Sequence, residues 1–137
     1  MTVTAMEHVL VLSDDIEATR EFYCDIVGLR VGERPPLSFG GYWLYAGEVP
    51  CLHIAERQSY LTHAAQLGLA ISREPPGTGS VDHIAFNAND YDRVRRRLTV
   101  NGVRSVPNCV PGAGLRQLFF EDPNGVRVEI NVRDHLS

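Results

Sequence analysis

Three histidines and one glutamate in this chain have the side-chain types and the spacing of a metal centre. His8 precedes His83 by 75 residues. His53 precedes Glu129 by 76 residues. A single histidine on a strand is more often structural than a ligand, so the prediction rests on this pairing. If the chain contains the same unit twice, the four residues occupy two pairs of equivalent places. Imidazole and carboxylate groups bind zinc, nickel, iron(II), cobalt and manganese, so the spacing predicts a site for one divalent metal ion.

The stretch around Glu129 predicts a tight turn followed by a strand. Asp-Pro-Asn-Gly at residues 122–125 favours a hairpin, because proline fixes one φ and Asn-Gly tolerates positive φ. From residue 126 to 132 apolar and polar side chains alternate strictly, which is typical of a half-buried strand. Glu129 lies on the polar face of this strand. A carboxylate is costly to bury without a partner, so it faces either water or a cation in a polar pocket.

The segments that carry these residues repeat in the order strand, helix, strand, strand, strand. In the first copy the predicted strands are residues 7–12, 29–34, 42–45 and 51–55. In the second copy they are residues 81–86, 103–106, 115–120 and 126–132. The candidate ligands fall on the first and fourth strands of each copy. We therefore predict an α+β fold of two tandem βαβββ modules in a single domain, residues 1–137. Module one covers about 5–56, a linker or insertion covers 57–79, and module two covers about 80–133.

Local signals predict where the helices begin and end. Asp14, with Glu17 three residues later, matches a capping box, and Gly28 suits the end of that helix. Asn89-Asp90 precedes the helix of the second copy. A short helix is predicted within residues 60–70, and residues 75–79 form a Pro- and Gly-rich linker.

Composition excludes several classes of function. The 137 residues are 44% hydrophobic and 22% charged, which is typical of a globular protein, and no apolar run approaches the roughly 20 residues that span a bilayer. The N-terminus does not look like a signal peptide, and three widely spaced cysteines suggest reduced thiols, so we expect a cytoplasmic protein. The net charge of −4 argues against nucleic-acid binding. All 13 basic residues are arginine, which excludes Schiff-base lysine chemistry and a P-loop lysine.

The residues also carry a family resemblance. The chain resembles the vicinal oxygen chelate superfamily, which includes glyoxalase I, extradiol ring-cleaving dioxygenases and bleomycin-sequestering proteins. The resembling segments are Glu7-His8-Val9, Phe22-Tyr23 with Gly28-Leu29, Asp82 to Phe86, and Phe120 to Ile130. The likeness covers nearly the whole chain except residues 57–79. It implies a glyoxalase-like fold with cupped mixed sheets and a divalent metal that chelates two adjacent oxygens of a small substrate. We expect a cytoplasmic enzyme that forms a homodimer.

Position by position, the resemblance places His8, His83 and Glu129 on the shared two-histidine, one-glutamate metal set. His53 falls where bacterial glyoxalase I has a glutamate ligand. Three imidazoles and one carboxylate leave a divalent site with a formal charge of +1, which makes it a stronger Lewis acid but removes one proton-transferring carboxylate. The function that this implies is a glyoxalase I-like lyase or isomerase that stabilises an enediolate, with Glu129 or a metal-bound hydroxide moving the proton.

Two other functions stay open at this point. If His53 is a base outside the ligand set, then His8, His83 and Glu129 form the triad of iron(II) oxygenases, and a ring-cleaving dioxygenase results. A metal-free protein that sequesters a drug or metabolite is the alternative from another class. In any of these cases Phe39, Trp43 and Tyr45 are candidates for the wall of the substrate pocket, although core packing would explain some of them equally well.

Overall fold

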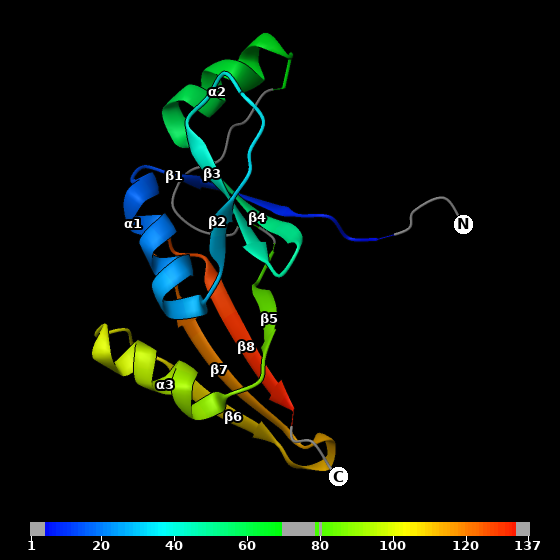
Figure 1. Cartoon of the computed structure of the whole chain (residues 1–137), viewed down its shortest axis with the longest axis vertical. Helices are drawn as coiled ribbons and strands as arrows, with labels where there is room; N and C mark the ends of the chain where they lie inside the picture. The colour runs from blue at the N-terminus through cyan, green and yellow to red at the C-terminus, as the bar shows by residue number, and fades with distance from the viewer. Residues whose placement is uncertain (1–4, 70–78, 80, 134–137) are drawn as a thin grey trace. The chain divides into compact units, whose positions relative to one another are not determined.

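The computed structural model describes residues 5–69, 79 and 81–133. The chain forms two compact units, residues 1–73 (unit 1) and residues 74–137 (unit 2). Each unit contains one four-stranded sheet and a helix that follows its first strand (Figure 1). Within the described residues, no helix is both long and apolar enough to cross a membrane.

The two units share the order strand, helix, strand, strand, strand. Unit 1 consists of β1 (Val9–Ser13), α1 (Ile16–Glu21), the π-helix η1 (Phe22–Val27), β2 (Arg30–Gly32), β3 (Gly41–Ala46), β4 (Val49–Glu56) and α2 (Arg57–Gln66). Unit 2 consists of β5 (Ile84–Ala88), α3 (Tyr91–Val100), β6 (Val106–Val110), the 3₁₀ turn η2 (Pro111–Ala113), β7 (Leu115–Glu121) and β8 (Arg127–Arg133). The sheet orders are β1-β4-β3-β2 and β5-β8-β7-β6. The first and fourth strands of each unit pair in parallel, and the other pairs are antiparallel. The predicted α+β fold with two βαβββ modules is confirmed.

Strand register shows that the repeat extends to single residues. His53 lies opposite Leu10 on β1, two residues after His8. Glu129 lies opposite Ala85 on β5, two residues after His83. Across the antiparallel pairs, Trp43 faces His53, and Phe119 faces Glu129. Each candidate fourth-strand ligand therefore has an aromatic cross-strand neighbour on the same sheet face.

Alternation along the strands separates a core face from a second face in each sheet. In unit 1, α1 packs on β3 and β4, where Leu44, Leu52 and Ile54 are buried. In unit 2, Val94 and Leu98 of α3 are buried, as are the residues of one β8 face. The latter are Val128, Ile130 and Val132. His53 and Glu129 have the opposite parity, so they lie on the other face of their sheets. We call this the site face of each unit.

The helix ends and some strand bounds differ from the prediction. Asp15, not Asp14, is the N-cap of α1, and its side chain accepts a hydrogen bond from the Ala18 amide. Asp14 instead forms an ion pair with Arg57 at 3.1 Å. Gly28 ends the π-helix in the left-handed conformation with φ of 98°, as predicted. Helix α3 follows Asn89-Asp90, as predicted, and Asp90 is its N-cap.

Two further boundaries shift. The strand predicted at 103–106 is wrong, because β6 covers Val106–Val110 and Val103 lies in the turn after α3, where its amide donates to the Leu98 carbonyl. The short helix begins at Arg57 rather than at residue 60. The 122–125 turn places only Gly125 at positive φ, because no described non-glycine residue has a positive φ. The predicted linker at 75–79 lies outside the described residues except for Gly79.

Candidate metal centre

In unit 1 the two candidate ligands lie against each other. His8 lies immediately before β1, and His53 lies in the middle of β4. Their rings stack with centroids 3.8 Å apart and an interplanar angle of 13°. Trp43 of β3 also stacks on His53, at 4.1 Å and 9°. His53 is therefore a member of two parallel ring stacks, one with His8 and one with Trp43.

His53 is buried, and its surroundings favour the neutral form of its imidazole ring. It is 8% exposed, and its Nε2 atom is buried without a hydrogen-bond partner among the residues that the structure describes. Burial lowers the pKa of His53 below its usual value, and the neighbouring His8 lowers it further. A backbone hydrogen bond with Pro50 partly offsets this shift. A neutral imidazole with an unused ring nitrogen is the form that binds a metal ion.

The stacked geometry also limits what the unit 1 pair can do as it stands. An imidazole binds a metal through a lone pair in the plane of its ring. Two nearly parallel rings at 3.8 Å cannot direct such lone pairs at one ion. Binding by both residues therefore requires one ring to turn. His8 is the ring with room to turn, because its side chain is 35% exposed and it precedes the strand.

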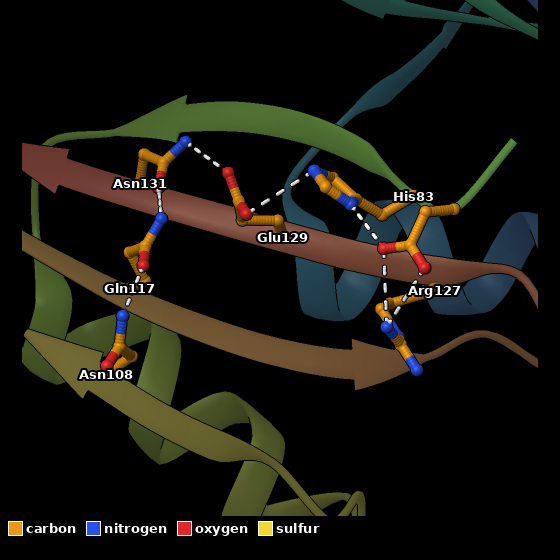
Figure 2. A network of polar contacts seen from close by, with 7 residues as sticks. His83, Asn108, Gln117, Arg127, Glu129 and Asn131 are labelled. Carbon is orange, nitrogen blue, oxygen red and sulfur yellow. Dashed lines mark hydrogen bonds and ion pairs between the residues drawn. The ribbon is translucent and has the colours of Figure 1, made fainter.

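In unit 2 the candidate ligands face each other through polar atoms. His83 Nε2 lies 3.5 Å from Glu129 Oε1 (Figure 2). Two ligand atoms at about 2.1 Å from a common metal ion would lie roughly 3.0–3.4 Å apart for angles between 90° and 109°. The observed separation is close to this range, so the unit 2 pair fits a metal ion with little movement. The buried Glu129 side chain, 11% exposed, thus faces His83 and Asn131 rather than open water.

A carboxylate directly before each histidine holds the imidazole ring. His83 Nδ1 donates to Asp82 at 2.8 Å, and His8 Nδ1 donates to Glu7 at 3.0 Å. The hydrogen bond from His83, followed by the charge of Arg127, lowers the pKa of Asp82. A carboxylate on one ring nitrogen orients a ligand histidine and leaves the other nitrogen for the metal. The sequence shows the acidic residue in both copies, but its contact with the ring depends on the backbone path before the strand.

The predicted pocket residues lie in three different surroundings. Trp43 contacts His53, as described above. Phe39 packs at 5.0 Å against both Tyr60 and His63 of α2, and His63 bonds to Ser38 at 2.7 Å. Tyr45 donates to the Glu33 carbonyl and lies beneath Arg30. Trp43 is thus the one of the three with a direct contact to a candidate ligand in the described structure.

Two hollows in unit 2 each include a residue that contacts the candidate pair, but neither is lined by His83 or Glu129. One of about 680 Å³ includes Phe119, whose ring stands edge-on to His83 at 6.4 Å. Another of about 480 Å³ includes Asn131 and Arg133. Within the described residues, no three metal-binding side chains gather into one cluster. The two pairs belong to separate units, so a single centre with all four ligands stays a prediction.

Comparisons with known proteins agree with this architecture. The model of the Glyoxalase/Bleomycin resistance protein/Dioxygenase superfamily matches residues 5–130. The chain belongs to this superfamily. Members of the superfamily often bind divalent metal ions and small molecules.

Individual superfamily members are distant from this chain. It is 28% identical to Glyoxylase I 4 of Arabidopsis thaliana, over 98% of this chain and 74% of that protein. A putative glyoxalase family protein from Bacillus anthracis has the same fold, with a TM-score of 0.71 and 21% identity over 98% of both chains. TnmS3, an antibiotic binding protein from Streptomyces sp. CB03234, has a TM-score of 0.69 and 20% identity over 98% of this chain and 99% of that chain. The fold therefore includes enzymes and binding proteins, and the activity must be argued from the site.

Proposed function

We propose that this member of the glyoxalase superfamily is a metal-dependent enzyme of the glyoxalase I type. It acts as a lyase or isomerase on a small molecule with two adjacent oxygen atoms. The observation that carries the proposal is the paired site: each unit places two metal-binding side chains together at equivalent register positions. A drug-sequestering protein would not need this repeated chemistry. The proposal includes a cytoplasmic homodimer.

In this proposal His8, His53, His83 and Glu129 hold one divalent metal ion, of the group zinc, nickel, iron(II), cobalt and manganese. The bound ion supplies Lewis-acid stabilisation of the negative charge that develops on the substrate oxygens. The acidic neighbours Glu7 and Asp82 keep the histidines in orientation. Glu129 is the group that accepts and returns the substrate proton, because it is the carboxylate of the set and its Oε1 faces His83.

One observation favours a second candidate function. His53 stacks between Trp43 and His8, and in this arrangement His53 and His8 cannot both bind the same metal ion. If His53 remains in this stack, it acts as a base beside the metal. His8, His83 and Glu129 then form a two-histidine, one-carboxylate triad, which leaves room for a catechol and dioxygen. An extradiol ring-cleaving dioxygenase is therefore the runner-up.

Metal analysis of the purified protein tests the proposal directly. We expect about one divalent metal ion per chain in the wild type and loss of that metal in the double variant His83→Ala, Glu129→Ala. His63→Ala is the matched control, because it removes a histidine outside both pairs and should leave the metal content unchanged. Full metal content in the double variant would contradict the proposed site.

The two candidate reactions differ in the metal ion that supports them and in whether they consume oxygen. The protein is loaded anaerobically with nickel(II) or iron(II) and offered an α-ketoaldehyde with a thiol, or a panel of catechols. Oxygen-independent turnover of the α-ketoaldehyde by the nickel form is the expected result. Ring cleavage with oxygen uptake by the iron form alone would favour the dioxygenase. No turnover by either form, with tight binding of an apolar ligand, would place the protein among the sequestering members.

A further inference from the structure

A continuous line of amide side chains crosses the site face of unit 2 and ends on Glu129. Asn108 of β6 donates from Nδ2 to Gln117 Oε1 at 2.7 Å, and Gln117 of β7 donates from Nε2 to Asn131 Oδ1 at 3.0 Å. Asn131 of β8 donates from Nδ2 to Glu129 Oε2 at 2.7 Å. Figure 2 shows the three amides in sequence across neighbouring strands, with Glu129 at one end and His83 beyond it. We call Asn108, Gln117 and Asn131 the amide ladder.

The negative charge of Glu129 sets the direction in which the amides of this ladder donate their hydrogen bonds. An ionised carboxylate only accepts hydrogen bonds, so Asn131 must turn its NH₂ group toward Glu129. The carbonyl oxygen of Asn131 then faces Gln117, which must offer its own NH₂ group. The carbonyl oxygen of Gln117 in turn faces Asn108, which donates. Every amide in the line therefore points a donor toward Glu129, and the edge-strand residue Asn108 is the outer end.

The two oxygens of Glu129 consequently have different surroundings. Oε2 is held by Asn131 at 2.7 Å, whereas Oε1 lies 3.5 Å from His83 Nε2. A carboxylate that is held at one oxygen cannot rotate freely about its last torsion, so the other oxygen stays aimed at the partner. On the far side of the pair, Asp82 holds His83, and Arg127 contacts Asp82 at 3.3 Å. Glu129 and His83 are thus each held by a hydrogen bond with a residue outside the pair, Asn131 and Asp82 respectively.

We propose that Asn131 and Gln117 are positioning residues that aim Glu129 Oε1 at the metal ion. This inference rests on the proposed function. Asn131 acts on Glu129 directly, and Gln117 acts by holding the Asn131 amide in the donating orientation. Asn108 lies at the exposed end, where the donor to Gln117 can be replaced by water. The effect on the metal should therefore decrease along the ladder from Asn131 to Asn108.

Cobalt(II) titration of the full-length protein tests the ladder, with affinity and the visible spectrum of the bound ion as readouts. Asn131→Leu keeps the side-chain size but removes the donor, and we expect it to weaken cobalt binding about 10- to 100-fold. Gln117→Met should have a smaller effect in the same direction, and Asn108→Leu should have almost none. Asn131→Leu should also change the cobalt spectrum, because the orientation of Glu129 changes.

Asn87→Leu is the matched control. Asn87 lies opposite Asn131 on the same sheet face, but it accepts from Arg133 at 2.7 Å and has no place in the ladder. A general loss of packing on this face would affect both asparagine variants, and thermal unfolding of the metal-free proteins measures that loss. If Asn131→Leu does not fold, Gln117→Met carries the test.

The outcomes separate the two proposals. If the wild type binds cobalt and Asn131→Leu or Gln117→Met binds it with the same affinity and spectrum, the ladder has no positioning role. Equal weakening by Asn87→Leu would likewise overturn it. If the wild type itself binds no cobalt, the proposed function fails, and the positioning role fails with it.

Discussion

Trp43 is the only tryptophan in the chain, and its indole stacks on His53 at 4.1 Å. Protonated imidazole in contact with an indole quenches its fluorescence, so Trp43 reports the charge of His53. Burial lowers the pKa of His53, so the ring stays neutral until the pH falls below its ordinary value of 6.5. We predict that Trp43 fluorescence in the metal-free protein decreases with a midpoint below pH 6.5.

His53→Gln is the control for this titration, because it removes the ionisable ring but leaves a polar side chain beside Trp43. The acid quenching should disappear in this variant. A midpoint above pH 6.5, or the same transition in His53→Gln, would contradict the lowered pKa of His53. The same shift predicts the sign of a stability effect. The unfolded chain binds a proton at His53 more readily than the folded chain, so this residue lowers stability as the pH falls below about 6.5.

At the residue scale, the sequence predicts which residues share a face but not how their side chains meet. The alternation along β8 correctly placed Glu129 on the strand face opposite to that of Val128 and Val132, because period two depends only on local sequence. Asn131 has the same parity as Glu129, so its place beside Glu129 was available from the sequence. The sequence does not show that Gln117 lies beside Asn131, because that contact depends on the register of β7 against β8. The ring stack of His53 also depends on cross-strand pairing.

Helix α1 shows how a distant contact decides a local boundary. Asp14 and Asp15 are both good N-cap residues, and the sequence alone favoured Asp14 because of Glu17. In the structure Asp14 pairs with Arg57, which is 43 residues away, and Asp15 caps the helix. Such boundaries depend on tertiary contacts that no local pattern contains.

The capping assignment leads to a comparison of two neighbouring substitutions. Asp15→Ala should lower the free energy of unfolding by about 1 kcal/mol, because the Ala18 amide loses its acceptor. Asp14→Ala should cost roughly 0.5 kcal/mol or less, because its ion pair with Arg57 is solvent-exposed. Urea unfolding of the two variants measures both values. A larger loss in Asp14→Ala would support the boundary that the sequence predicted.

The start of β3 makes a second comparison possible. A Cβ atom at Gly41 would lie 1.9 Å from the carbonyl oxygen of Ile54, on the paired strand β4. Gly41→Ala must therefore push the strands apart, and we expect a loss of about 3 kcal/mol or more. At Gly40 the nearest atoms are 3.7–3.9 Å away, so Gly40→Ala should change stability by less than about 1 kcal/mol. Thermal unfolding distinguishes the two, and equal effects would contradict the close approach of β3 and β4.

At the scale of the whole molecule, the sequence repeat predicted the topology of both units. The same strand order and the same register of His53 and Glu129 follow from one repeated pattern. The shared apolar alternation explains this success, because each module must bury one sheet face under its own helix. A site that combines the two units is a different kind of prediction, since it depends on the assembly of the modules and not on either pattern.

A metal titration followed by thermal unfolding tests that assembly. If both pairs bind the same ion, the wild type binds one ion per chain, and saturation at 100 times the dissociation constant adds about 2.7 kcal/mol to its stability. His8→Ala changes only unit 1, and Glu129→Gln changes only unit 2. Either substitution alone should remove most of the stabilisation. If each pair bound its own ion, each variant would instead keep binding at the unchanged unit.

Mixing two variants that each lack one of the two pairs then shows whether both pairs of a metal centre come from the same chain. One chain carries His8→Ala with His53→Ala, and the other carries His83→Ala with Glu129→Ala. A tether of a few tens of residues keeps the units of one chain at a high effective concentration, which favours a centre within the chain. We therefore expect the mixture, after unfolding and refolding together, to bind no more metal than the separate variants. Recovery of about a quarter of the wild-type sites would mean that each centre combines unit 1 of one chain with unit 2 of its partner, because random pairing makes half of the dimers mixed and each of those has one intact centre.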